Sequence, residues 1–414
     1  MRQGVGVHLK RLILPVYLPM FFLSIGISAP VAGFPQYLGG LGASLAVVGL
    51  VVSLQGIGNL ISDLPGGMII TRVRLRSVMI VCYLAAAGAS VGLSLTSSVV
   101  VIGALVLIAG TMTSVVVTAM MTYVRLTVPT ASRGRALSVV GGSLRAGGFI
   151  GPVIGGLLID NLGVPSAFVL RAVCIVGSVV AVALSPDRSV DVPKTESKPG
   201  IRDQASLVAA GMKGRWFALS TVGSAVMILS LLRATRTFAL PLWGDALSLT
   251  AGTIGMIISA GTFVELLLFV PAGMIMDRAG RKVAASVCIG VFSAGVLLLP
   301  LSSGLAGFVL ASMLIGLGNG FGAGINMTLG TDLAPRNAPS AFLGLWRLFG
   351  DAGKSAGPAL VGTLATAVGL SASLFVTAGI GAVGFILMAL VAPETLHLAD
   401  GGKPGDSGRR PLHH

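Results

Sequence analysis

A small set of ionisable side chains stands inside long apolar stretches of this 414-residue chain. They are Asp63, Arg145, Arg171, Arg233, Arg236, Glu265, Arg347, Asp351 and Lys354. A charge in an apolar setting is costly, so it is expected either to be paired or to serve a function. Because burial favours a neutral carboxyl and a nearby cation favours a charged one, separating such a pair favours protonation. The sequence therefore predicts charge pairs, with proton exchange at Asp63, Glu265 or Asp351.

The apolar stretches themselves predict helices that cross a membrane. The chain is 54% hydrophobic and only 10% charged, and its mean hydropathy is +0.95, a composition foreign to soluble domains. A bilayer core about 30 Å thick takes roughly 20 apolar residues per helix. Twelve such spans are predicted to begin near Leu12, Ala46, Val78, Val99, Ala136, Val164, Trp216, Thr250, Val283, Leu305, Ala341 and Ala372. Since alternating strand patterns are absent from the sequence, the predicted fold class is an all-α membrane protein.

Basic residues gather in every second connection between these spans. Three such connections contain Arg74 and Arg76, Arg133 and Arg135, and Arg281, whereas the connections between them contain no Lys or Arg. The positive-inside rule then places both termini in the cytoplasm of a multi-pass protein, expected in a bacterial inner membrane. The net charge of +14 follows from this topology, and nucleic-acid binding is not expected.

An internal repeat divides the chain into two halves. The offset of 206 residues between Pro65 and Pro271 also relates Pro35 to Pro241 and Arg72 to Arg278. An even number of spans in each half gives parallel repeats, here two six-helix bundles. The predicted domains are a first bundle over 1–185, a cytoplasmic linker over 186–214, a second bundle over 215–396 and a cytoplasmic tail over 397–414.

The repeated motif resembles one found in the major facilitator superfamily. The segment "GMIMDRAGRK" over 273–282 is similar to the signature between the eighth and ninth helices of that family, and "GMIITRVRLR" over 67–76 is a weaker copy. The segment "RAGGFIGPVIGG" over 145–156 resembles the fifth-helix motif of its twelve-helix drug/proton antiporters. The resemblance implies alternating access and a gating motif. Its members here are Gly67, Arg72, Gly273, Asp277, Arg278, Gly280 and Arg281. In the closed cytoplasmic mouth, Asp277 is expected to face the helix that begins near Ala136 in the other half.

Depth along the helices predicts which charges meet. At 1.5 Å per residue the relevant charges lie about 9 to 20 Å from the cytoplasmic ends of their helices. In the family arrangement the second helix abuts the eleventh, and the fifth abuts the eighth. Asp63 is therefore expected to pair with Arg347 or Lys354, and Arg145 with Glu265. Such pairs are either broken during transport or are permanent structural contacts.

Other contacts are expected for the remaining charged residues. Arg347 and Asp351 are four residues apart and can pair on one helix. Arg171, Arg233 and Arg236 are placed nearer the extracellular ends, where their side chains are expected to snorkel.

Carboxamides and aromatic residues supply the candidate lining of a cavity. The candidates are Gln55, Asn59, Phe22, Phe263, Asn319 and Asn326. Gln55, Asn59 and Asp63 are spaced by four residues and share one helix face. Since carboxamides inside the spans are few, the cavity suits a lipophilic solute better than a sugar.

The leading functional hypothesis is a secondary active transporter of the multidrug efflux type. It would export small lipophilic or amphipathic compounds by proton antiport. The alternative is a proton-coupled or facilitative transporter of a small anion or metabolite, suggested by the intramembrane arginines. A receptor or scaffold is a third class. The expected acid of helix one is missing, and helix four carries only Arg125 at its end, which departs from the antiporter pattern.

Other classes of activity are not expected. The four histidines are terminal, and no nucleophile lies beside a base, so an enzyme is not expected. The sequence suggests no metal and no cofactor, with a proton gradient as the driving force. The expected partners are a small-molecule substrate and the lipid bilayer, and the chain is expected to act as a monomer.

Overall fold

The computed structural model describes residues 12–185, 216–335 and 339–395, and describes only the backbone of residues 63–72, 130–131 and 340–341. All regular secondary structure in this part of the chain is helical. Backbone N–H and C=O groups inside a bilayer must bond to each other, and a helix satisfies them within one segment. The side chains of Asp63, Gly67 and Arg72 lie outside the described residues.

The first half of the chain supplies six spanning segments. The first is broken into a π turn (Ile13–Tyr17), α2 (Leu18–Ser28), a 3-10 turn (Ala29–Ala32) and α3 (Phe34–Gly40). The break coincides with Pro30 and Gly33, which do not continue a regular helix. The others are α4 (Leu45–Arg72), α5 (Leu75–Leu95), α6 (Val99–Thr127), α7 (Thr130–Leu162) and α8 (Val164–Leu184).

The second half repeats this pattern. Its helices are α10 (Trp216–Ala246), α11 (Ala251–Ala279), α12 (Arg281–Leu301), α13 (Leu305–Phe321), α14 (Ile325–Leu333), α15 (Pro339–Val368) and α16 (Leu370–Ile386), followed by a π turn (Leu387–Val391). The tenth span is divided between α13 and α14, where Gly324 has φ +78°. Glycine takes this left-handed conformation without strain.

The predicted fold class, an all-α membrane protein with twelve spanning helices, is confirmed. Eleven segments of the described chain are long and apolar enough to cross a bilayer. The twelfth is α15, a helix of 30 residues that carries Arg347, Asp351 and Lys354. The helix expected near Ala136 begins at Thr130, directly after Pro129, because the basic turn before the apolar run also becomes helical.

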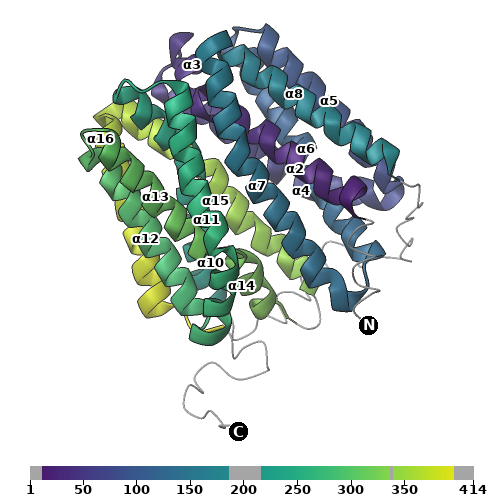
Figure 1. Cartoon of the computed structure of the whole chain (residues 1–414). Coiled ribbons are helices and arrows are strands. Elements are labelled where there is room, and N and C mark those ends of the chain that lie inside the picture. The colour runs from purple at the N-terminus through teal and green to yellow at the C-terminus, as the bar shows by residue number, and fades with distance from the viewer. Residues whose placement is uncertain (1–11, 186–215, 336–338, 396–414) are drawn as a thin grey trace.

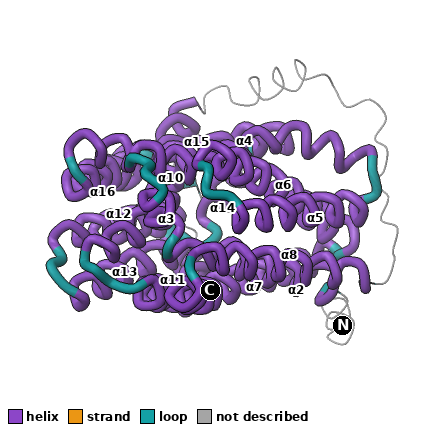
Figure 2. Tube along the Cα trace, turned by 90° about the horizontal axis from the view of Figure 1, so that it is seen from above, coloured by secondary structure: helices purple, strands orange, loops and turns teal. Residues whose placement is uncertain are grey.

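Two groups of helices lie side by side, one from each half (Figures 1 and 2). Helix α4 of the first group packs along α15 of the second, and α7 packs along α11. We call these two contacts the seam. The domain limits at 185 and 215 stay a prediction, although α8 ends at Leu184 and α10 begins at Trp216.

One end of the seam is closed by close backbone approach. We call the end that holds the Arg-free connections the non-basic end, and the opposite one the basic end. A β-carbon at Gly49 would overlap the carbonyl oxygen of Pro358, and one at Gly255 would overlap that of Pro152. Small residues of this kind let membrane helices come together. Gln36 Nε2 also donates to the Pro241 carbonyl at 2.7 Å, so the two groups are held together at this end.

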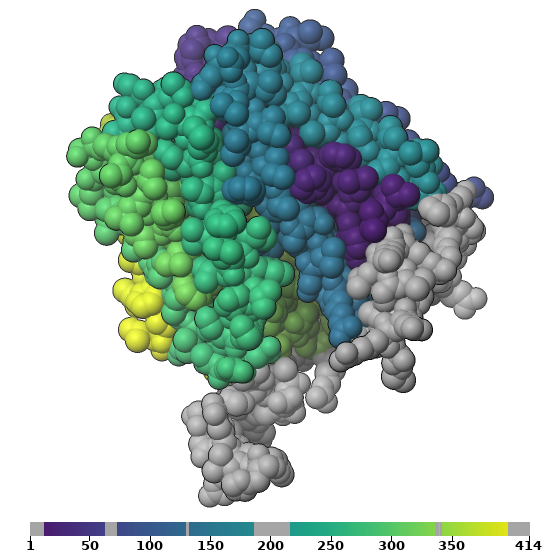
Figure 3. Space-filling model, viewed as in Figure 1, coloured from purple at the N-terminus to yellow at the C-terminus, as the bar shows by residue number. Residues whose placement is uncertain are grey.

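In the part of the chain that the structure describes, the basic end of the seam is open. A β-carbon added at Gly134 or Gly142 of α7, or at Gly273 of α11, would meet no atom within 4 Å. Figure 3 shows α7 and α11 in contact in the upper part of the molecule and separating toward its lower edge. The structure therefore represents a state that is closed at the non-basic end.

Candidate functional site

A buried carboxylate stands at the middle of the seam. Glu265 of α11 is 8% exposed. Arg236 Nη1 lies 3.2 Å from its Oε2 atom, and Asn319 Nδ2 donates to the same oxygen at 2.6 Å. Arg236 Nη2 also donates to Thr262 Oγ1, one turn from Glu265, at 2.9 Å. Three helices of the second bundle thus converge on one carboxylate, which is bonded despite its burial.

The first bundle contributes one cation to this carboxylate. Arg145 Nε of α7 lies 3.3 Å from Glu265 Oε1, although this buried nitrogen has no hydrogen-bond geometry to any acceptor. The guanidinium also lies over the ring of Phe269, with its carbon 4.4 Å from the ring centroid. Arg145 is therefore attracted to the second bundle by charge, but is bound less tightly than Arg236.

Arg233 connects this cluster to the helix break. Its Nε donates to Asn319 Oδ1 at 2.7 Å, and its Nη2 donates to the Gly322 carbonyl at 2.9 Å. Gly322 follows the last residue of α13, where the helical hydrogen bonds end. Carbonyls at a helix terminus lack partners within the helix and attract a cation. The broken span therefore fixes the position of Arg233.

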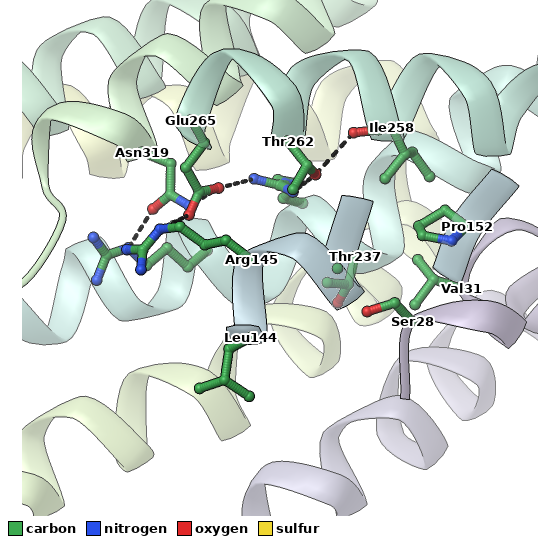
Figure 4. A pocket seen from close by; sticks show the side chains of 13 residues that line it. Ser28, Val31, Leu144, Arg145, Pro152, Thr237, Ile258, Thr262, Glu265 and Asn319 are labelled. Atoms are coloured by element: carbon green, nitrogen blue, oxygen red, sulfur yellow. Dashed lines mark hydrogen bonds and ion pairs between the residues drawn. The ribbon is translucent and has the colours of Figure 1, made fainter. Parts of the chain in front are cut away.

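A cavity of about 360 Å³ lies against these charges. Figure 4 shows Glu265 and Asn319 with Arg145 on one side, and Ser28, Val31 and Pro152 on the other. Both bundles contribute to its lining. A cavity at the interface of two repeats, at mid-depth, is where secondary transporters bind their substrates.

A second cavity of about 300 Å³ adjoins the first, because Val31, Arg233 and Thr237 line both. Its wall includes the carboxamides Gln55 and Asn59 of α4. Arg171 of α8 and Lys354 of α15 supply two more cations. Lys354 Nζ lies 2.9 Å from Oδ1 of Asp351, which is itself buried.

Cations outnumber acids around the joined cavities. Those that line them are Arg145, Arg171, Arg233, Arg236 and Lys354. The described acids in contact with them are Glu265 and Asp351. A low-dielectric wall strengthens such an excess, so the joined cavities favour a negatively charged guest.

A larger groove lies elsewhere. It has a volume of about 660 Å³ between α12 and α16, and its lining contains no ionisable residue. Phe375 and Phe385, two of its lining residues, are 43% and 40% exposed. The groove offers no charged group that would orient a polar solute.

Several predicted site residues come together as expected. The expected pairing of Arg145 with Glu265 is present. Gln55 and Asn59 line a cavity, and Asn319 belongs to the charged cluster. Asp351 pairs with Lys354, three residues away, which was not one of the expected pairs. Arg347 is exposed on the same helix, and the expected partner Asp63 has its side chain outside the described part.

Other candidates lie away from the cavities. Phe263 is 45% exposed and its ring centroid lies 5.7 Å from that of Phe149, on the rim of the seam. Phe22 packs against Gly177 of α8 and lies 6.0 Å from Phe21 between ring centroids. Asn326 lies on α14, where its carbonyl accepts from Trp346 Nε1 at 2.8 Å. None of the three is among the residues that line the two cavities.

The gating motif is attached to its own bundle in this structure. Asp277 has a 77% exposed side chain that lies 3.6 Å from Arg281 Nη1, and Arg278 is exposed. Arg281 Nε lies 3.2 Å from Asp332 Oδ2 of α14. Gly280 has φ +98°, and a β-carbon there would collide with Glu394. The expected contact of Asp277 with the first bundle is not made while the basic end is open.

Three arginines were expected to snorkel toward the extracellular surface, and this expectation is wrong. Arg171 is 5% exposed, and Arg233 and Arg236 bond inside the charged cluster. The error arose from the length of the seventh span. Helix α10 continues for 31 residues through Pro241, which places Arg233 and Arg236 about 20 and 15 Å from its non-basic end.

Comparison with known proteins agrees with the fold. A family model described as Major Facilitator Superfamily matches residues 16–235 and 222–414. An uncharacterized MFS-type transporter of Mycobacterium tuberculosis, Rv1250, is 28% identical over 145 residues, 35% of this chain. The chain spans 25% of the length of that relative in the match.

Solved transporter structures share the fold at low sequence identity. A POT family transporter in complex with a thioalcohol-conjugated peptide superimposes with a TM-score of 0.76 at 13% identity, covering 94% of this chain and 95% of its own. The nucleoside transporter NupG gives 0.70 at 17%, covering 93% and 98%. The human organic anion transporter MFSD10 gives 0.67 at 15%, covering 92% and 99%.

The family model covers nearly all of the chain, and the two bundles with a charged cavity between them have the architecture of a secondary transporter. The chain belongs to the Major Facilitator Superfamily.

Proposed function

We propose that this chain transports small organic anions with an apolar body, by alternating access. The observation that carries the proposal is the excess of cations over acids along the joined cavities. Adding the undescribed Asp63 to Glu265 and Asp351 would still leave five cations facing three acids. Apolar residues such as Val31 and Ile258 complete the lining, which suits the uncharged part of such a substrate.

Seam geometry supports an alternating mechanism. The cavities lie beyond an open basic end and behind a non-basic end that is closed by Gly49 and Gly255. If positive loops face the cytoplasm, substrate enters from the cytoplasmic side. Rocking of the bundles about the central charges would then close the basic end and open the other, so that the same site is reached from each side in turn.

Glu265 is the proposed site of proton coupling. It is the acidic residue among those that line the first cavity, and it contacts cations from both bundles. A neutral Glu265 would free Arg145 and Arg236 for an anionic substrate, whereas a charged one competes for them. Proton and anion would therefore support each other's binding at the same step.

Export of neutral lipophilic compounds by proton antiport is the second candidate. The fifth-helix segment over 145–156 favours it, because this segment resembles the motif of drug/proton antiporters. Its Gly147, Gly151 and Gly155 pack against α2 and the turn after it. In that case Arg145 and Arg236 serve only to hold Glu265. The cations Arg171 and Lys354 have no role in this alternative.

Transport in proteoliposomes separates the two candidates. We would compare naphthalene-2-sulfonate, which stays anionic, with its neutral isostere naphthalene-2-sulfonamide, with and without an imposed pH gradient. The proposal expects saturable transport of the sulfonate that exceeds transport of the sulfonamide. Saturable transport of the sulfonamide alone would establish the second candidate instead.

A further inference from the structure

Arg171 stands apart from the other cationic residues of the cavity. It is 5% exposed, and its Nε atom is buried without a hydrogen-bond partner. No described acid lies within ion-pair distance of it, whereas Arg145 and Arg236 share Glu265. An arginine keeps its charge at any physiological pH, so it cannot relieve its burial by losing a proton.

The backbone of Asp63 lies at another depth in the bundles than that of Arg171. Helix α4 begins at Leu45 at the non-basic end, and the backbone of Asp63 lies about 27 Å farther along this helix. Helix α8 begins at Val164 at the same end, and the backbone of Arg171 lies about 10 Å farther along it. The backbone positions of the two residues therefore differ in depth by about 17 Å.

Packing directs the side chain of Arg171 toward the cavity. Gly26 of α2 lies against its backbone, and a β-carbon at Gly26 would be 3.3 Å from its Cα and 3.4 Å from its Cγ. The remaining side of Arg171 is part of the wall of the second cavity. A buried guanidinium is costly unless acceptors or an anion meet it, and no described acceptor meets the Nε of Arg171.

The surroundings of Arg171 indicate the rest of the ligand. Phe168, one helical turn before it, forms an edge-to-face pair with Phe34, with ring centroids 5.4 Å apart at 90°. Both rings line the same cavity, as does the carboxamide of Gln55. An aromatic body fits beside such rings, and a carboxamide can donate to an anionic oxygen.

We infer that Arg171 binds the anionic group of the transported compound, and that this compound is an aromatic carboxylate or sulfonate whose ring lies against Phe34 and Phe168. The inference rests on the proposed transport of organic anions and assigns the subsite. A planar guanidinium matches a carboxylate or sulfonate with two parallel hydrogen bonds. In the present state Arg145 and Arg236 are paired with Glu265, and Arg233 is bonded to Asn319 and the Gly322 carbonyl. The anionic group is therefore assigned to Arg171, whose Nε has no hydrogen-bond partner among the described residues.

Binding to the purified full-length protein tests this assignment. Naphthalene-2-sulfonate and naphthalene-2-sulfonamide would be titrated by calorimetry against the wild type, Arg171→Gln and Arg171→Lys. Arg125→Gln is the matched control, because Arg125 is an exposed arginine at the end of α6. We expect Arg171→Gln to lose about tenfold or more in sulfonate affinity. We expect Arg171→Lys to lose less, and neither the control nor sulfonamide binding to change.

The outcomes separate this inference from the proposed function. If the wild type binds and transports the sulfonate, and Arg171→Gln binds it equally well, the subsite is wrong while the proposed function stands. If the wild type binds and transports neither aromatic sulfonates nor aromatic carboxylates, the proposed function fails and the subsite fails with it.

The thermal stability of the ligand-free protein supplies a readout that does not depend on the choice of probe. A structural arginine is expected to lower the Tm of the ligand-free protein when it is replaced. We expect the opposite, since Arg171→Met removes an uncompensated buried charge: its Tm should rise, and the sulfonate should no longer raise it further. A Tm that falls for both Arg171→Met and Arg171→Lys would overturn the assignment in favour of a structural role.

Discussion

The Nε atom of Arg145 and the Oε1 atom of Glu265 lie 3.3 Å apart across the seam. Glu265 also holds Arg236 and Asn319 from its own bundle at 3.2 and 2.6 Å. When the bundles separate, the carboxylate keeps two partners and Arg145 loses its counter-charge. The free-energy change of breaking this contact therefore falls mainly on Arg145, which also loses the ring of Phe269 on α11 and keeps the Gly141 carbonyl of its own helix.

The strength of the cross-seam pair can be measured with a double-mutant cycle. We expect Arg145→Gln and Glu265→Gln to show a coupling free energy of about 1 kcal/mol, because both side chains are largely buried but misaligned. Thermal unfolding followed by tryptophan fluorescence gives the four stabilities. The cycle of Arg236→Gln with Glu265→Gln is the comparison and should give a larger coupling. Equal couplings would contradict the view that Glu265 belongs to the second bundle.

Proton coupling is expected to depend on Glu265. In Glu265→Gln the side chain carries no titratable proton, so an imposed pH gradient should no longer drive net transport of naphthalene-2-sulfonate. Exchange of the labelled for the unlabelled sulfonate across the membrane should persist, since it needs no net proton movement. Asp351→Asn serves as the control and should keep its response to the gradient. A response that survives in Glu265→Gln would assign the proton to another group.

The closed non-basic end is expected to be sensitive to single methyl groups. Gly255→Ala places a β-carbon on the Pro152 carbonyl, which should destabilise the present state by about 1 to 3 kcal/mol. Spin-label distances across the non-basic ends of α7 and α11 should then shift to longer values. Gly88→Ala on α5 is the control, because a β-carbon there meets no atom within 4 Å. Unchanged distances in Gly255→Ala would contradict glycine-mediated closure.

The motif at the basic end is expected to act in the opposite state. Asp277 is exposed here, so Asp277→Asn should leave this state unharmed and weaken the one closed at the basic end. Distances between the basic ends of α7 and α11 should shift toward the open population. Asp245→Asn removes an exposed acid at the non-basic end and should have no such effect. A balance of states that Asp277→Asn leaves unaltered would exclude this role.

Two glycines with positive φ allow the cost of backbone strain to be measured apart from the cost of a steric clash. Gly280 has φ +98° and Glu394 occupies the place of its β-carbon, whereas Gly324 has φ +78° and open space. Gly324→Ala should cost about 1 to 2 kcal/mol through the backbone alone. Gly280→Ala should cost more, because it also displaces the carboxylate that accepts from the N–H groups of Arg281 and Lys282. Thermal unfolding of both variants checks the order.

Helix positions and one charge pair could be predicted from the sequence because they depend on local properties. Apolar length gave the start of α6 at Val99 and of α8 at Val164. Equal depth on neighbouring helices gave the pairing of Arg145 with Glu265. Both follow from the rise per residue and from the family arrangement, without knowledge of side-chain orientation.

Facing directions could not be predicted in the same way. Helices in this protein are apolar on every side, so the pattern hardly distinguishes a face toward lipid from a face toward a cavity. Phe22 and Phe263 were placed in the cavity on residue type alone, and they lie elsewhere. The position of Arg233 was predicted wrongly because the carbonyl that it contacts belongs to Gly322, 89 residues later in the chain. The distance of Arg233 from both ends of α10 was the feature that could have indicated its central position.

The two ends of the seam differ in the chemistry that closes them. The non-basic closure consists of backbone carbonyls against glycines such as Gly49 and Gly255, and neither partner carries a net charge. The opposite closure would rely on Asp277 and its basic neighbours, whose attraction is weakened by dissolved ions. Raising the ionic strength should consequently favour the conformation seen here, so the transport cycle would respond to the salinity of the compartment that faces the basic end.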